Sequence, residues 1–118
     1  MGVTALSLTG KLRDILTGTT EQIRQSRTIC AKLHDSHVKY ASEKIDGTDT
    51  IIGREGHLNL VGNGEFELVF GTSSAFRVKV DELQIWEFMS LDGAVMTGND
   101  LNTGKLRTVT SYYDKHLT

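Results

Sequence analysis

The sequence predicts a single α+β domain over residues 1–118, in which two N-terminal helices cover a curved, mainly antiparallel sheet of about five or six strands. Three observations lead to this expectation. Apolar residues recur with helical spacing before residue 40, residues 57–113 alternate between apolar and polar in short runs, and glycine, asparagine and aspartate separate those runs. The chain contains no proline, so these three residue types must form the turns.

Composition and charge argue against several classes of protein. The formal net charge of −2 is unlike that of domains that bind nucleic acid electrostatically, because such domains are usually strongly basic. A single cysteine excludes an intramolecular disulfide. The chain has no apolar run of the roughly 18 residues that a membrane helix needs, and its N-terminus lacks the pattern of a secretory signal. We therefore expect a cytoplasmic protein without nucleic-acid or membrane partners.

The first expected helix lies within residues 1–18 and spans about 8 to 10 residues. Thr9 is placed to cap this helix, and Gly18 can end it in a left-handed conformation. The apolar residues have roughly the spacing of an amphipathic helix, and they are Leu6, Leu8, Leu12, Ile15 and Leu16.

The second expected helix begins at Thr19-Thr20-Glu21-Gln22, which matches a capping box. Its pattern continues to about Lys39 or Ser42, before Asp46-Gly47 interrupts it. The apolar side is narrow and consists of Ile23, Cys30, Leu33 and Tyr40. A narrow apolar stripe is typical of a helix that covers a sheet.

The segment His57–Phe70 carries the clearest local signal in the chain. Asn63-Gly64 separates two alternating runs, and both residues tolerate the positive φ angles of a type I′ hairpin turn. The resulting register puts five apolar side chains on one face: Leu58, Leu60, Phe66, Leu68 and Phe70. The opposite face then carries His57, Asn59, Glu65 and Glu67.

The remaining strands are expected on either side of this hairpin. The segments concerned are Thr50–Ile52, Ala75–Val80, Leu83–Met89, Ala94–Met96 and Leu106–Tyr113. Leu83–Met89 is apolar at both alternating positions, which favours a central strand that is covered on both faces. Asp92-Gly93 is the expected turn after it.

Aromatic and polar residues of the predicted sheet are the candidates for a binding site. Trp86 and Phe88 could form an apolar wall, and of the successive residues Tyr112 and Tyr113 one must point to each face of the last strand. Arg107 and His57 could add polar contacts. The candidate ligand-binding residues are therefore His57, Trp86, Phe88, Arg107, Tyr112 and Tyr113.

Two other patterns could bind an ion or a phosphate. Cys30, His34 and His37 would share one face of the second helix, but their span suits a single tetrahedral metal poorly, so we favour a half-buried cysteine beside two surface histidines. The segment Gly98–Lys105 departs from the spacing of both a phosphate loop and an EF-hand. We read it as a hairpin loop with Gly104 at a positive-φ position, and we expect neither a metal nor a cofactor.

The C-terminal part resembles a known superfamily. Leu83–Phe88, followed by Gly104–Arg107 and Tyr112–Asp114, is similar to the closing strands of the cone-shaped proteins that include nuclear transport factor two and the polyketide cyclases. The resemblance covers about 30 residues and implies a hydrophobic pocket inside a cone and frequent dimerisation through the sheet. It identifies no catalytic residue.

Three functions are compatible with these patterns. The first is a domain that binds an apolar small molecule in a pocket between the curved sheet and the helices. The second is a protein–protein interaction module, such as an accessory protein of a mobile element or phage, with a homodimer as one form. The third is an enzyme of the isomerase, cyclase or dehydratase kind, with His57, Asp92, Arg107 or Asp114 at its pocket.

Overall fold

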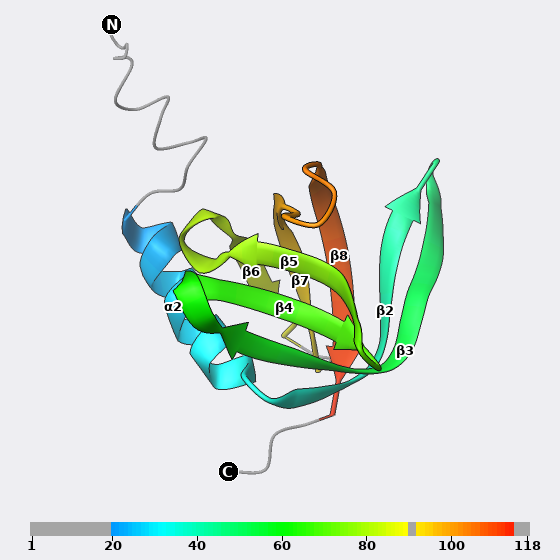
Figure 1. Ribbon diagram of the computed structural model, residues 1–118, viewed down its shortest axis with the longest axis horizontal. Coiled ribbons are helices and arrows are strands. Elements are labelled where there is room, and N and C mark those ends of the chain that lie inside the picture. Colours follow the sequence, from blue (N-terminus) through cyan, green and yellow to red (C-terminus); the bar gives the residue numbers. More distant parts are fainter. Residues whose placement is uncertain (1–19, 90–91, 115–118) are drawn as a thin grey trace, which may run out of the picture.

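The computed structural model describes residues 20–89 and 92–114. The first expected helix, within residues 1–18, lies outside these residues. Along the described chain, helix α2 (Thr20–Leu33) is followed by seven strands (Figure 1). The strands are β2 (Ser36–Ile45), β3 (Thr48–Val61), β4 (Glu65–Phe70), β5 (Ser73–Lys79), β6 (Gln84–Glu87), β7 (Gly93–Asn99) and β8 (Leu106–Tyr113). Two short 3₁₀ helices, η1 (Gly62–Gly64) and η2 (Val80–Glu82), complete the order.

The predicted fold class, with two helices over five or six strands, is wrong. The described residues form one α-helix and a seven-stranded sheet in the order β5-β4-β3-β2-β8-β7-β6, so the protein is mainly β. Every pair of neighbouring strands is antiparallel. The sheet curls strongly, so that β3, β4 and β5 lie in front of β6, β7 and β8, and α2 lies across one end (Figure 1).

The additional strand β2 replaces the second half of the expected helix. The helix ends at Leu33 because Asp35 adopts a positive φ of 67°, and its N–H donates to the Leu58 carbonyl. After this turn, Ser36 and Val38 are buried in a two-residue alternation. Such an alternation places the side chains on one face of a strand, which a helix could not do.

Strand β3 is one long strand where the sequence predicted two. It joins the expected Thr50–Ile52 strand to the hairpin strand through Gly53–Gly56. Gly53 and Gly56 lie under the ring of Phe70, where an added Cβ would come within 2.5 Å of other atoms. Glu55 has a positive φ of 57° between them. The strand therefore bends at this point, and its first half continues beyond the rest of the sheet (Figure 1).

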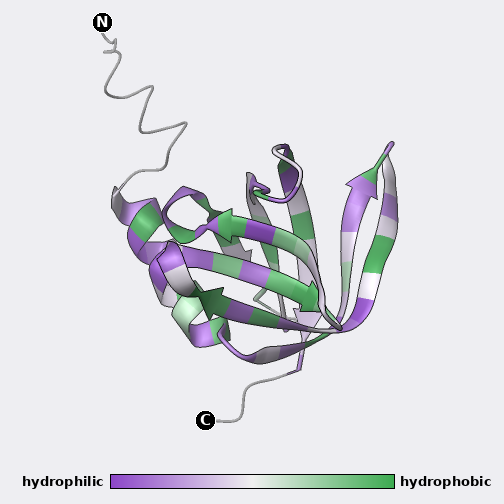
Figure 2. Ribbon diagram, in the orientation of Figure 1, coloured by the Kyte–Doolittle hydropathy of each residue, from purple (hydrophilic) through white to green (hydrophobic). Residues whose placement is uncertain are grey.

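The predicted β3–β4 hairpin is confirmed. Leu58 pairs with Leu68 and Leu60 with Phe66, so the expected apolar residues share one face. The connection is the three-residue segment Gly62–Gly64, one residue longer than the loop of the expected type I′ turn. The last two residues of this segment have positive φ angles, 68° and 71°. Figure 2 shows the hydrophobic and hydrophilic residues alternating along β4 and β5.

Side chains fill the interior of the curled sheet. The largest side chains that are buried almost completely come from α2 and from every region of the sheet: Leu33, Val38, Leu58, Phe66, Leu68, Phe76, Val78, Leu83, Met96 and Val109. We call the sheet face toward this core and α2 the inner face, and the opposite face the outer face. Because side chains fill the interior, a ligand or partner would have to bind in an open pocket or on the surface.

The segment Leu83–Met89 is not a central strand. Its strand, β6, is the last one in the sheet order and covers only Gln84–Glu87. Leu83 and Ile85 are buried in the core, whereas Trp86 is 50% exposed. The apolar character at both alternating positions therefore arises because one side faces the core and the other carries an exposed aromatic residue.

Candidate functional site

The predicted ligand-binding residues lie in four separate places. Trp86, Phe88 and Tyr112 lie on the outer face of the sheet. Tyr113 points to the inner face and is 4% exposed. Arg107 lies in a buried ionic network, and His57 is exposed on β3. No single pocket of the described chain unites them.

The outer-face aromatics form a continuous group with one further residue, Tyr40, which sequence reasoning placed on a helix. The Tyr40 and Tyr112 rings stack with centroids 4.6 Å apart, and Phe88 stacks on Tyr112 at 5.9 Å. Trp86 lies on β6, two residues before Phe88, and Met89, in the bend that follows Phe88, is fully exposed. We call Tyr40, Trp86, Phe88, Met89 and Tyr112 the outer aromatic patch.

The strand register explains why these residues gather. Tyr112 is paired with Tyr40 on one side and with Gly93 on the other. Gly93 leaves the room that Phe88 occupies, because an added Cβ there would lie 2.9 Å from the Phe88 ring. A second row of paired residues runs across the outer face of the strands beside these rings. It consists of Trp86, Val95, Thr110 and Ser42, and it carries no charge.

Tyr113 belongs to the inner face and to the contact with α2. Its hydroxyl donates to Glu87 Oε2 at 3.3 Å, and Lys32 of α2 also donates to that carboxylate at 3.0 Å. Burial, followed by the Glu87 charge, raises the pKa of Tyr113. The phenol therefore stays protonated at neutral pH and ties the last strand to the β6 edge.

Arg107 is at the centre of an ionic network on the inner face of β8. It binds the Glu43 carboxylate with two N–H groups, at 2.9 and 2.7 Å, and donates to Asp100 Oδ2 at 2.9 Å. A fourth bond runs to the Ala75 carbonyl, and the guanidinium lies 5.5 Å from the Phe76 ring centroid. The hydrogen bond with Glu43 raises the pKa of Arg107 above its ordinary value. These partners leave its guanidinium little capacity to bind a ligand.

Asp100 anchors the β7–β8 loop against β5, along the edge of β5 that has no strand neighbour. The carboxylate is fully buried and accepts hydrogen bonds from the backbone N–H groups of Arg77 and Asn102, both at 3.1 Å. Leu101 N–H donates to the Arg77 carbonyl at 2.7 Å. Burial raises the pKa of Asp100, but the bonds from Arg107, Thr103 and the two backbone groups outweigh it and leave the pKa lowered. Gly104 has a φ of 74°, as the loop interpretation predicted.

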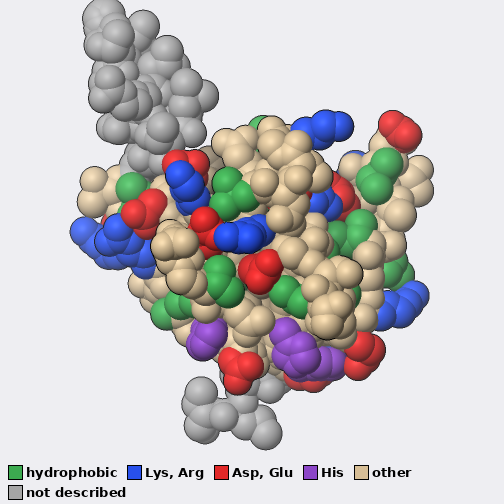
Figure 3. Space-filling model, viewed as in Figure 1, with side chains coloured by type: hydrophobic (Ala, Val, Ile, Leu, Met, Phe, Trp, Pro, Cys, Tyr) green, Lys and Arg blue, Asp and Glu red, His purple; other side chains and the backbone are tan. Residues whose placement is uncertain are grey.

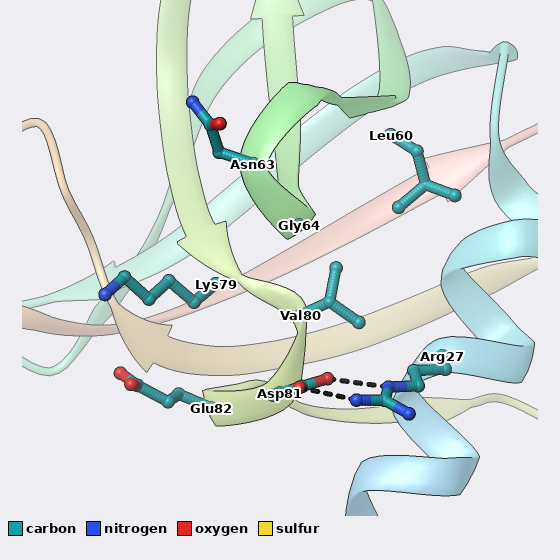
Figure 4. Close-up of a pocket in the computed structure, with 8 residues that line it drawn as sticks. All are labelled: Arg27, Leu60, Asn63, Gly64, Lys79, Val80, Asp81 and Glu82. Atoms are coloured by element: carbon teal, nitrogen blue, oxygen red, sulfur yellow. Dashed lines mark hydrogen bonds and ion pairs between the residues drawn. The ribbon is translucent and has the colours of Figure 1, made fainter.

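An open pocket of about 480 Å³ lies where α2 approaches the β3–β4 turn and η2 (Figure 4). Leu60 and Val80 supply its apolar surface. The charged residues around it include Arg27 and Asp81, which form a two-bond ion pair at 2.8 and 2.7 Å. The pocket is lined by Arg27, Leu60, Asn63, Gly64, Lys79, Val80, Asp81 and Glu82. None of the candidate ligand-binding residues is among them.

The proposed face of Cys30, His34 and His37 does not exist, because the helix ends at Leu33. Cys30 is fully buried in α2, and burial raises the pKa of its thiol to about 12. His34 lies in the following turn, where Nδ1 accepts the Leu60 N–H at 2.8 Å. His37 belongs to β2. Within the described residues, no three His, Cys, Asp or Glu side chains are grouped to hold a metal ion.

His37 instead forms a surface cluster that the sequence did not reveal. Its Nδ1 lies 2.6 Å from Asp114 and its Nε2 lies 3.0 Å from Glu55, while the His57 ring meets it edge-on at 5.8 Å. The hydrogen bonds with Asp114 and then Glu55 raise the pKa of His37. Figure 3 shows histidine and acidic side chains together at this end of the molecule. The cluster links the end of β8 to β2 and to the bend in β3.

The residues considered for catalysis do not meet in a pocket of the described chain. His57 and Asp114 flank His37 at the surface, and Asp114 is bound by His37. Arg107 lies in its own ionic network, and Asp92 precedes β7 and accepts the Tyr113 N–H through its backbone carbonyl. We therefore do not carry the enzyme hypothesis further.

Comparisons with known proteins give no identity. No family model, curated protein or solved structure matches the chain. The resemblance to the nuclear transport factor two superfamily therefore stays a prediction. Within residues 20–89 and 92–114, no helix has the length and hydrophobicity needed to span a membrane.

Proposed function

We propose that the domain is a protein–protein interaction module and that the outer aromatic patch is its recognition surface. The observation that carries this proposal is the exposure of large apolar side chains on the outer face of the sheet and in the bend that follows β6. Trp86 is 50% exposed and Met89 fully exposed, beside the stacked rings of Phe88 and Tyr112. Tryptophan, tyrosine, phenylalanine and methionine are enriched at protein interfaces.

The surroundings of the patch support the same proposal. The outward positions near Trp86 on β2, β7 and β8 are uncharged, and they are Ser42, Val95, Thr97, Thr108 and Thr110. The exposed Lys39 and Arg54 border the patch beside Tyr40. Charged residues are depleted in the centre of protein interfaces because desolvating them is costly. A partner that offers an apolar surface of its own would therefore fit this face.

Capture from an extract of the source cells, with matched variants, tests the proposal. The double variant Trp86→Ser/Met89→Ser removes two exposed apolar side chains from the patch. The control, Leu101→Ser/Leu106→Ser, removes two side chains that are 43% and 69% exposed elsewhere. We expect a partner to be retained by the wild type and the control and lost by the patch variant. A photo-crosslinking residue at position 86 should join the same partner.

Two results would overturn the proposal. One is a set of retained proteins that does not differ between the wild type and the patch variant. The other is a partner that the control loses to the same extent, because its recognition would then not depend on the patch. Circular dichroism of each variant checks that the sheet is intact.

The open pocket beside α2 favours a second candidate function, the binding of a small amphipathic molecule. Leu60 and Val80 would contact its apolar part, and Lys79 would contact an anionic group. The filled interior of the sheet and the charged pocket lining are the reasons that we rank it second. Dodecanoate is a suitable probe: specific binding should shift the NMR signals of Leu60 and Val80, and unchanged signals at millimolar probe would reject this function.

A further inference from the structure

One edge of the sheet remains open in the part of the chain that the structure describes. Strand β3 pairs with β2 from Thr48 to Leu58, but β4 pairs with it only from Gly56 to Val61. The segment Thr48–Arg54 therefore has a strand neighbour on one side only. Together with the end of β2 it forms an arm that projects beyond the other strands (Figure 1).

The other two edges of the sheet are covered, which sets this one apart. The β7–β8 loop binds the edge of β5 through the Leu101 N–H and the Asp100 carboxylate. Helix α2 covers β6, where the Gln25 amide donates to the Ile85 carbonyl at 3.2 Å. Natural proteins cover or charge free edges because an open edge is a template for another strand. An edge left open in such a sheet is a candidate binding surface.

The open edge is suited to strand pairing. Its sequence Thr48-Asp49-Thr50-Ile51-Ile52 is rich in β-branched residues, and Ile51 is 45% exposed. Ile45 and Thr48 face each other across the two-residue turn Asp46-Gly47, in which both residues have positive φ angles. In such a hairpin these flanking residues bond to each other, so the next alternate residues, Asp49 and Ile51, direct their N–H and C=O groups to the open edge.

We propose that this edge pairs with the same edge of a second copy of the chain, antiparallel about a two-fold axis at Ile51. The edge is self-complementary in this register. Ile51 meets Ile51 of the second copy, and Asp49 faces the uncharged Gly53. Arg54 faces Thr48, so no two like charges stand opposite each other.

The local geometry limits the strength of the dimer. Ser42 pairs with Ile51 and Ala41 with Gly53, so Ile52 is the extra residue of a bulge. The bulge interrupts the regular ladder on one side of Ile51, which leaves a short run of intermolecular bonds. We therefore expect a weak dimer with a dissociation constant of about 0.1 mM. The second copy binds through the arm and not through the outer aromatic patch, so the inference goes beyond the proposed function.

Analytical ultracentrifugation up to about 1 mM protein, with two matched variants, tests the dimer. Ile51→Lys places two lysines opposite each other at the axis, and like charges directly across a strand pair are destabilising. Ile45→Lys changes the other arm isoleucine, which is also 45% exposed but lies on β2. We expect a concentration-dependent dimer for the wild type and Ile45→Lys, and at least a tenfold weaker one for Ile51→Lys.

A disulfide trap gives a second readout. Hydrogen-bonded residues opposite each other in antiparallel strands lie about 5.5 Å apart at Cα, within the range of a disulfide. Ile51→Cys should oxidise to a covalent dimer and Ile45→Cys should not. The native Cys30 is fully buried and does not compete.

Three results would overturn the inference. They are a wild type that stays monomeric at the highest concentration, equal weakening by the two lysine variants, or loss of the dimer in Trp86→Ser/Met89→Ser. The last result would move the contact to the outer aromatic patch. Partner capture by the patch does not depend on the arm, so failure of the dimer leaves the proposed function standing.

Discussion

The β6 edge and the β5 edge are both covered, but by side chains of opposite character. At the β6 edge, α2 packs Ile29, Cys30 and Leu33 into the apolar core. At the β5 edge, the β7–β8 loop is held by Asp100 and Arg107. The first contact depends on filled volume and the second on complete pairing of buried charges. The two edges should therefore respond differently to substitution.

The largest effect is expected at the apolar edge. Leu33→Ala removes a fully buried side chain and leaves a cavity between α2 and the sheet, which should lower the free energy of unfolding by about 4 kcal/mol. Leu33→Met conserves the volume and should cost about 1 kcal/mol. Urea denaturation measures both. Similar losses for the two variants would contradict a contact that depends on volume.

The stability of the polar edge should depend on keeping all of its buried charges paired. Arg107→Met leaves the carboxylates of Glu43 and Asp100 buried without their cation, so we expect a loss of about 3 kcal/mol in the free energy of unfolding. Adding Glu43→Leu removes one unpaired charge and should restore part of the loss. A double variant as unstable as the sum of the single variants would show that the ion pair is not the cause.

Two buried serines should have opposite effects on stability when each is replaced by alanine. Ser26 donates to the Val80 carbonyl at 2.7 Å, so Ser26→Ala breaks a bond at the helix-covered edge and should cost about 1 kcal/mol. The Ser111 hydroxyl is buried and has no hydrogen-bond partner among residues 20–89 and 92–114. Ser111→Ala should therefore stabilise the protein by about 1 kcal/mol. Thermal unfolding of both variants checks this, and a destabilised Ser111→Ala would refute it.

The smallest expected effect is on the pH dependence of the free energy of unfolding. The pKa of Asp100 is lower in the folded than in the unfolded protein, so its contribution is complete above an ordinary aspartate pKa of about 4 and is lost as the pH falls through the folded value. Between pH 7 and pH 3, the free energy of unfolding should decrease less for Asp100→Asn than for the wild type. Equal slopes would mean that Asp100 does not drive the acid sensitivity of this edge.

Local patterns predicted what depends on near neighbours in the chain. The Asn63-Gly64 turn, the alternation of Phe76, Val78 and Val80, and the last strand Leu106–Tyr113 all follow the sequence. Each depends on side-chain periodicity or on residues that accept a positive φ. The outer aromatic patch was predicted in part, since Trp86, Phe88 and Tyr112 were candidates. Tyr40 was missed because a helix was expected there.

The tertiary structure decided where α2 ends, which strands pair and which edges stay open. The turn at Asp35 is held by the Leu58 carbonyl, more than 20 residues away in the sequence, so no local window around the helix contains the signal that ends it. Arg107 lies between Leu106 and Thr108 in the sequence, but its three partners come from β2, β5 and the β7–β8 loop. The sequence by itself determined the turns and the inward side of most strands, because these depend on each residue's own conformational preference. Strand order, burial of charge and the open edge depend on contacts between distant segments, which exist only once the sheet has curled.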